Sequence, residues 1–196
     1  MQINKEVLKN LEPCADRYEH FLNYNADFDG SFSDFLYLPN VNYDDKVWVA
    51  KRVLTKNQLV KWAMLCIESV VHIFEEKYKG DKSLSNCINF LKTVNDFDSL
   101  TDAQILEVKK RVKAKCVAFC YTRDAADDSP IAFIATNADY VFFTNAAAHY
   151  AVEGAAQAAF AAANASSDVE DAIYIAAKLK QQALNLKFLN QVIGGV

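Results

Sequence analysis

Four polar side chains recur at every fourth position of an otherwise apolar segment, a spacing that places side chains on one face of a helix. They are Asn145, His149, Glu153 and Gln157. Such a line can form a polar groove that holds a partner's side chain or a small ligand. It can equally be the solvent-exposed edge of an amphipathic helix, and the ordinary pattern of such helices favours this second interpretation.

A long stretch of the chain lacks positive charge, because no Lys or Arg occurs between Arg123 and Lys178. Eight acidic side chains lie within it. The first four make up a candidate anionic docking surface for a cationic partner: Asp124, Asp127, Asp128 and Asp139. Several of the acids also lie near the predicted starts of helices, where the helix dipole favours negative charge, so capping is an alternative explanation.

A calcium-loop pattern occurs in Asn25–Leu36, where oxygen-bearing side chains alternate and the sixth residue is Gly30, as in an EF-hand. The last position needs a bidentate glutamate, but the chain has Leu36 there. A polar turn before a helix capped by Ser31 shows the same pattern and is the preferred interpretation. The three histidines are isolated, and Glu68 and His72 share a helical face as a surface pair would. We therefore expect no metal site and no cofactor.

Catalytic motifs are the next feature to consider. The five cysteines include no C-x-x-C pair, and Cys116 and Cys120 fit core packing in a reducing compartment. No G-x-S-x-G, phosphate loop or dinucleotide fingerprint occurs in a chain with five glycines. We expect a protein that is not an enzyme.

Charge and hydropathy limit the class of partner. The formal charge of −4 argues against a nucleic-acid binder, whose footprint is an excess of Lys and Arg. No signal-peptide core or membrane-length apolar run is present. The composition therefore predicts a cytoplasmic protein that binds neither nucleic acid nor membrane.

Helices must position these residues. Capping-box patterns at Thr55/Gln58, Thr101/Gln104 and Ser167/Glu170 each precede a long apolar-periodic segment. The first predicts a helix to about Lys79, whose buried stripe is Leu59, Trp62, Cys66, Val70 and Ile73. In the less regular N-terminal part, four short helices are predicted, at Lys5–Asn10, Cys14–Asn23, Ser31–Leu36 and Asp44–Val53. No alternating run is long enough to require a sheet.

The segment Pro130–Asn164 is apolar on most sides and rich in alanine, which predicts a long central helix. We expect Trp62 to be buried against it. A closing helix is predicted to start at Ser167, to end near Gly194 and to bury Ala172, Ala176, Leu179, Ala183 and Leu186. The fold class is thus all-α, a compact multi-helix bundle in a single domain, 1–196, with a less regular part, 1–54, and a helical core, 55–196.

The segment Leu59–Glu75, followed by Asp81-Lys82 and later by Ala-rich helices, resembles the putative immunity protein family of helical bacterial and phage proteins. The pattern Leu8–Phe21 around Cys14 and the helix centred on Trp48 are similar to segments that accompany this domain. The resemblance implies a helical fold and the cytoplasm of a bacterium or of a phage-infected host cell. It supplies no catalytic residues.

Three functions from different classes are compatible with these patterns. The first is a non-enzymatic inhibitor or immunity-type protein that binds and neutralises a protein partner, a toxin or a host or defence factor. The second is a protein that binds or sequesters a small molecule, such as a nucleotide signal, beside His149. The third is a structural protein that forms homo-oligomers through small-residue helix faces.

Overall fold

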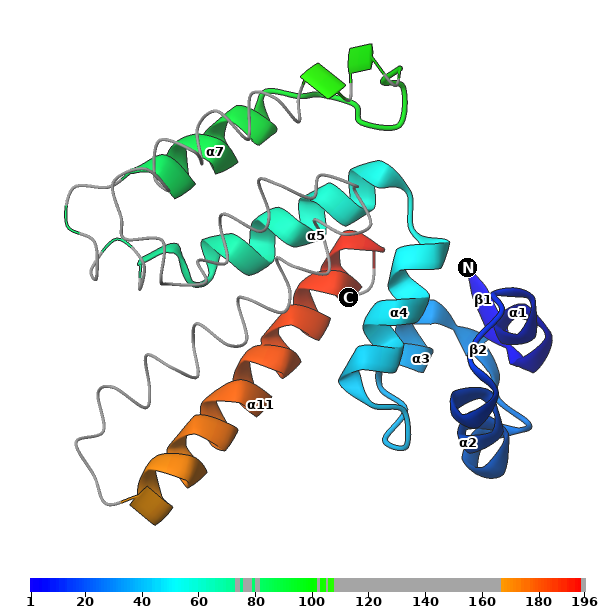
Figure 1. Ribbon diagram of the computed structural model, residues 1–196. Coiled ribbons are helices and arrows are strands. Elements are labelled where there is room, and N and C mark those ends of the chain that lie inside the picture. The colour runs from blue at the N-terminus through cyan, green and yellow to red at the C-terminus, as the bar shows by residue number, and fades with distance from the viewer. Residues whose placement is uncertain are drawn as a thin grey trace. The chain divides into compact units, whose positions relative to one another are not determined.

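A computed structural model describes residues 1–72, 75, 79, 82–101, 103, 104, 106, 107 and 167–194 (Figure 1). The described elements are mostly α-helices, as predicted, but they include a two-stranded sheet. The all-α prediction is therefore wrong in this respect. The predicted central helix at Pro130–Asn164 lies outside the described residues.

The sheet pairs β1 (Gln2–Asn4) with β2 (Asp29–Ser31) in antiparallel register, and Ile3 lies opposite Gly30. Each strand has three residues, which is too short for an alternating pattern to appear in the sequence. A Cβ atom at Gly30 would lie 2.8 Å from the ring of Phe28. This close approach gives the glycine of the calcium-like pattern a structural reason.

The four short N-terminal helices are confirmed to within two residues. They are α1 (Lys5–Asn10), α2 (Ala15–Asn25), α3 (Phe32–Leu36) and α4 (Tyr43–Val53). Three of these helices have a polar N-cap residue. The side chains of Asn4, Ser31 and Asn42 each accept a hydrogen bond from the backbone N–H three residues later. The predicted Ser31 cap is confirmed, but Asp29–Ser31 before the helix form the strand β2 and not a turn.

The chain divides into two compact units, Met1–Leu54 with Leu189–Val196, and Thr55–Phe188. In the first unit, the ring of Phe35 lies 6.1–6.3 Å from the rings of Phe21, Phe28 and Phe32. The Ser33 hydroxyl donates to Oδ1 of Asn190, so α3 holds the end of the last helix in the same unit. The prediction of a single domain stays a prediction.

The second unit contains α5 (Lys56–Glu68) and α7 (Ser83–Lys92), which lie side by side, and most of α11 (Ser167–Val192) (Figure 1). The Thr55/Gln58 capping box is confirmed, as is the reciprocal pair Thr101/Gln104. The predicted end of the first helix is wrong, because α5 ends at Glu68 rather than near Lys79. There the Ser69 hydroxyl bonds to the carbonyl of Cys66 and the Val70 N–H bonds to that of Ile67, which tightens the last turn.

The closing helix has the predicted range but the wrong predicted face. Leu179 is 59% exposed, and Ala176 and Ala183 are exposed as well. The buried face carries Gln181, Asn185 and Leu189 instead, each four residues after the last, and Asn190 is buried near the end of the helix. The prediction of this face assumes that apolar residues are buried and amides are exposed, and in this helix two amides on another face are buried.

A loop after α7 is tied to the start of α5 through Asn57. Its side-chain amide donates to Oδ1 of Asp96 at 2.6 Å, and its Oδ1 accepts from the backbone N–H of Phe97 at 2.6 Å. Asp98 accepts from the N–H of Lys56 at 2.8 Å, which satisfies a free donor of the first turn of α5. These hydrogen bonds attach the loop after α7 to the first turn of α5.

We expect Asn57→Ala to lower the free energy of unfolding by about 1–3 kcal/mol, because it removes the hydrogen bond from the N–H of the buried Phe97 to the Asn57 side chain. Urea titration followed by circular dichroism measures this loss. Asn86→Ala, an exposed position in α7, is the matched control and should change stability by no more than about 0.5 kcal/mol. Equal effects of the two substitutions would show that the Asn57 contacts contribute nothing.

Candidate functional site

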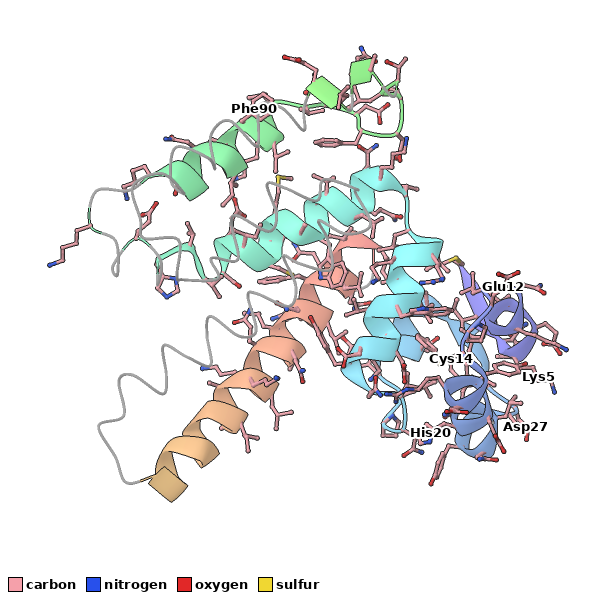
Figure 2. The ribbon with its side chains drawn as sticks, in the orientation of Figure 1. Lys5, Glu12, Cys14, His20, Asp27 and Phe90 are labelled. Carbon is pink, nitrogen blue, oxygen red and sulfur yellow. The ribbon has the colours of Figure 1, made fainter. Side chains whose placement is uncertain are left out.

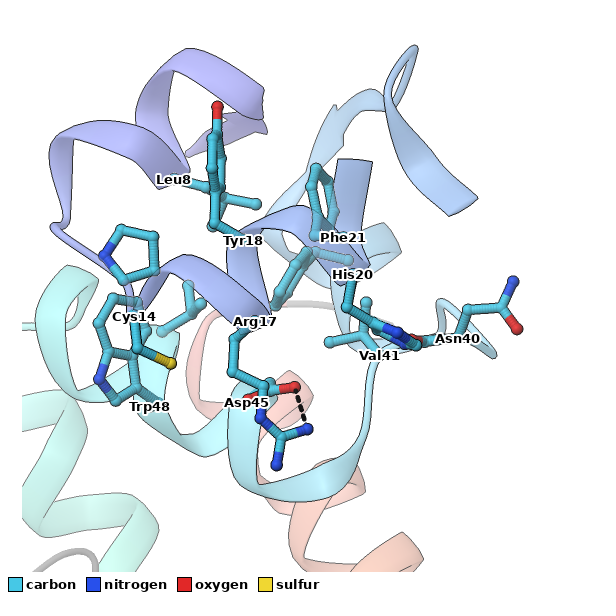
Figure 3. A pocket seen from close by; sticks show the side chains of 13 residues that line it. Leu8, Cys14, Arg17, Tyr18, His20, Phe21, Asn40, Val41, Asp45 and Trp48 are labelled. Atoms are coloured by element: carbon cyan, nitrogen blue, oxygen red, sulfur yellow. Dashed lines mark hydrogen bonds and ion pairs between the residues drawn. The ribbon is translucent and has the colours of Figure 1, made fainter. Parts of the chain in front are cut away.

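A pocket of about 80 Å³ lies between α2 and α4 in the first unit, and we call it the α2–α4 pocket (Figure 3). It is lined by Leu8, Pro13, Cys14, Arg17, Tyr18, His20, Phe21, Phe35, Asn40, Val41, Asp45, Trp48 and Val49. Cys14 and His20 belong to the start and middle of α2 (Figure 2). The lining residues therefore come from four helices, from the segment between α1 and α2 and from the turn before α4.

Helical spacing explains which side chains reach the pocket. From α2 they are Arg17, Tyr18, His20 and Phe21, with Cys14 at the N-cap, and their spacing of three or four residues places them on one side of the helix. From α4 they are Asp45, Trp48 and Val49, with the same spacing. The hydroxyl of Tyr18 donates to the carbonyl of Lys5 at 3.0 Å, which joins α2 to the first turn of α1.

The floor of the pocket is apolar. Leu8, Phe21, Phe35, Val41 and Val49 are all buried and present hydrocarbon surface to it. Apolar surface that a pocket exposes to water is a source of binding free energy, because covering it removes it from water. The floor therefore suits an apolar group.

The mouth of the pocket is charged. A guanidinium nitrogen of Arg17 lies 3.5 Å from Oδ2 of Asp45, with the two side chains 55% and 26% exposed (Figure 3). Burial raises the pKa of the Asp45 carboxyl, the nearby Asp44 raises it further, and the charges of Arg17 and His20 act in the opposite direction. Nε2 of His20 lies 3.0 Å from the carbonyl of Asn40 and so fixes the imidazole at the rim.

Trp48 forms one wall of the pocket and is held in place by Arg52. The guanidinium carbon of Arg52 lies 3.7 Å from the centre of the indole ring, within the range of a cation–π interaction. Nη1 of Arg52 also donates to the Trp48 carbonyl at 3.3 Å. The aromatic wall is thus positioned before any ligand arrives.

The substitution Asp45→Asn tests whether the partly buried carboxylate of Asp45 lowers the free energy of unfolding. Because the folded pKa of Asp45 is raised, the folded state binds its proton more tightly, and stability falls as pH rises from the unfolded value through the folded one. An asparagine never ionises and escapes this loss. We therefore expect Asp45→Asn to be more stable than Asp44→Asn at pH 7, with a smaller difference near pH 4.

Urea titrations of the two variants between pH 4 and pH 8 measure this difference. Asp44 is the matched control because it is exposed and lies in the same first turn of α4, so both variants lose the same favourable charge at the helix start. If Asp44→Asn proved the more stable variant at pH 7, the ionised carboxylate of Asp45 would stabilise the folded chain, and the prediction would be wrong.

A second polar arrangement is buried in the second unit. Nε2 of Gln181 donates to the hydroxyl of Ser69 at 2.9 Å and to Oδ1 of Asn185 at 3.0 Å, and Nε1 of Trp62 donates to the Asn185 carbonyl at 2.9 Å. Trp62 and Asn185 are completely buried. These bonds join α5 to α11. Burial also raises the pKa of the Cys66 thiol on this face of α5, which keeps it protonated.

The predicted site residues lie outside the described residues. This applies to the candidate polar groove of Asn145, His149, Glu153 and Gln157 and to the candidate anionic docking surface of Asp124, Asp127, Asp128 and Asp139. Both stay predictions. Cys116 and Cys120 are outside the described residues as well, and Glu68 forms an ion pair with Lys92.

The sequence signal for the α2–α4 pocket was weak. The helical spacing from Cys14 to Phe21 was visible, but it is also the spacing of an ordinary core-facing helix. Only the folded chain brings Leu8, Val41 and Asp45 to the same place.

The burial of Trp62 is confirmed, and its hydrogen-bond partner is α11. The central helix that was predicted to cover it lies outside the described residues. Within the described part of the chain, no helix is long and apolar enough to cross a membrane.

Comparisons with known proteins give one family. Residues 52–99 match the family described as Imm-5 like putative immunity protein. No curated protein and no solved structure matches the chain significantly. The matched segment begins in the last turn of α4 and includes α5, α7 and the loop tied to Asn57. At residues 52–99 the chain therefore carries the Imm-5 like putative immunity protein pattern.

Proposed function

We propose that this chain is a non-enzymatic immunity-type protein that binds and neutralises a protein partner, a toxin or a host or defence factor. The observation that carries the proposal is the match of residues 52–99 to the Imm-5 like putative immunity protein family. An immunity protein acts by occupying a surface of its partner, so its own requirement is a shaped and complementary surface.

The surface of the first unit supports a protein partner over a metabolite. Sites for small molecules are commonly about 300–1,000 Å³. The α2–α4 pocket measures about 80 Å³, which suits a single side chain. Tyr24 and Tyr37 are exposed to 61% and 66%, and tyrosine is enriched at protein interfaces because its ring is rigid and amphipathic.

Neutralisation is tested in two stages. The tagged full chain is first used to capture proteins from its source cells. Each captured protein is then expressed in a bacterial host, alone and together with this chain. We expect one captured protein to arrest growth alone and to lose that effect on co-expression. The proposal fails if no captured protein is toxic, or if co-expression leaves every toxic one unaffected.

A thermal-shift screen with nucleotides and common metabolites separates this proposal from small-molecule sequestration. A ligand at 100 times its Kd stabilises the folded state by about 2.7 kcal/mol, which shifts the melting temperature measurably. We expect no such shift. A reproducible shift with one nucleotide would favour the alternative function.

A further inference from the structure

We propose that the α2–α4 pocket is the point at which the protein partner docks, and that it receives one aliphatic side chain adjacent to a Lys or Arg of that partner. This inference rests on the proposed function, because it names the partner chemistry that one surface of the chain selects. The argument has three steps, from the floor, the mouth and the rim of the pocket.

The floor selects an aliphatic group of limited size. A cavity of about 150 Å³ is known to take up benzene, so about 80 Å³ admits the end of a leucine, isoleucine or valine side chain. Leu8, Phe21 and Val49 offer it only hydrocarbon contacts. Each methylene that moves from water into such a site adds to the free energy of binding.

The mouth selects a positive neighbour. Arg17 is the ion-pair partner of Asp45 among the described residues, at 3.5 Å, and it is more than half exposed. An ionised carboxylate can accept about four hydrogen bonds, so Asp45 can bind a second cation. Asp44 adds negative charge beside it on α4. An acidic residue of a partner would meet repulsion from both carboxylates, of which the single guanidinium of Arg17 offsets only part.

The rim supplies an amphipathic border. The rings of His20 and Tyr24 lie 5.0 Å apart on α2, and His20 contacts Asn40 of the pocket lining. Tyr24 is largely exposed. Rims of this kind exclude water from a central anchor, which is the arrangement found around energetically dominant interface residues.

Cys14 provides a direct test, because its thiol lines the pocket and is exposed. Three probes are supplied as mixed disulfides with 2-mercaptoethanol: acetyl-Cys-Leu-Arg-amide, acetyl-Cys-Ala-Arg-amide and acetyl-Cys-Leu-Glu-amide. The Cys14 thiolate attacks the probe sulfur and releases 2-mercaptoethanol. Peptide-mapping mass spectrometry then measures the equilibrium fraction of Cys14 modified by each probe.

We expect the Leu-Arg probe to have an exchange constant at Cys14 about tenfold above that of the Ala-Arg probe, because leucine buries additional carbon in the floor. Its advantage over the Leu-Glu probe should be about threefold, the size of a partly exposed charge interaction. Equal constants for the three probes would overturn the inference.

Asp45→Asn and Asp44→Asn make the second test. The preference for arginine over glutamate should be lost in Asp45→Asn and only weakened in Asp44→Asn, because Asp45 lines the pocket and Asp44 does not. The preference for leucine over alanine should persist in both variants, which shows that the pocket is still folded. An arginine preference that is unchanged in Asp45→Asn would contradict the proposed role of this carboxylate.

These outcomes separate the pocket from the function. Selective labelling without any neutralised partner would leave the side-chain preference of the pocket standing and remove the proposed function, and the docking role with it. A neutralised partner that binds Asp45→Asn as tightly as the unchanged chain would remove the pocket inference alone. Light scattering that showed a dimer dependent on Asp45 would assign the pocket to a second copy of the chain and would also overturn it.

Discussion

Replacing Trp62 with alanine is expected to lower the free energy of unfolding by about 3–5 kcal/mol. The indole is completely buried in the second unit, and its Nε1 donates to the Asn185 carbonyl of α11 at 2.9 Å. The substitution therefore removes a large apolar group, leaves a cavity and takes away one hydrogen bond to a buried carbonyl. Urea titration of both proteins, followed by circular dichroism, measures the loss.

Two further variants separate packing from hydrogen bonding. Trp62→Phe keeps most of the buried ring but has no donor, and we expect it to lose about 1–3 kcal/mol. Lys61→Ala changes the exposed neighbouring residue and should stay within about 0.5 kcal/mol of the unchanged chain. If Trp62→Ala were as stable as Lys61→Ala, the described face of α5 would not be a core face.

The burial of Trp62 and the short helices before it could be predicted because their signals are local. A cap such as Ser31 or Thr55 acts on a backbone N–H three residues away, and both were visible in the sequence. The apolar stripe on α5 likewise predicts the buried face of a single helix. Such features need no knowledge of what packs against them.

Features that depend on tertiary contacts escaped prediction. The strands β1 and β2 are three residues each and are separated by two helices. At the end of α5, Ser69 and Val70 form hydrogen bonds to the last turn of the helix. The sequence shows no sign of this end, because the apolar periodicity continues to Ile73. The lining of the α2–α4 pocket is assembled from segments as far apart as Leu8 and Val49.

The buried face of α11 was mispredicted for a specific reason. The apolar stripe that predicts the buried face does not include Gln181 or Asn185, and isolated amides are costly to bury. In the folded chain they bond to Ser69 and to each other, which satisfies them. Side-chain pairing of this kind cannot be inferred from one helix alone, since the partner lies more than a hundred residues away in the sequence.

Asn185→Asp is expected to destabilise the chain strongly and in a pH-dependent way. The substitution keeps the shape of the side chain but places a carboxyl group at a position with no exposed surface. Full burial raises the pKa of such a group by up to about 3–5 units, and each unit corresponds to about 1.36 kcal/mol. The Gln181 amide can still donate to it, which offsets part of this cost. We expect a loss of about 4 kcal/mol at pH 7.

The sign of the pH dependence follows from the raised folded pKa. Near pH 4 the new carboxyl group is protonated in the folded chain and the loss is small. As pH rises above the unfolded value of about 3.9, the unfolded state ionises first, and the loss grows until pH exceeds the folded pKa. Urea titrations of the variant and the unchanged chain at each pH give this difference directly.

Gln191→Glu makes the same amide-to-carboxylate change at an exposed position of α11 and should cost at most about 1 kcal/mol. A loss for Asn185→Asp that matched this control at every pH would show that residue 185 is accessible to water.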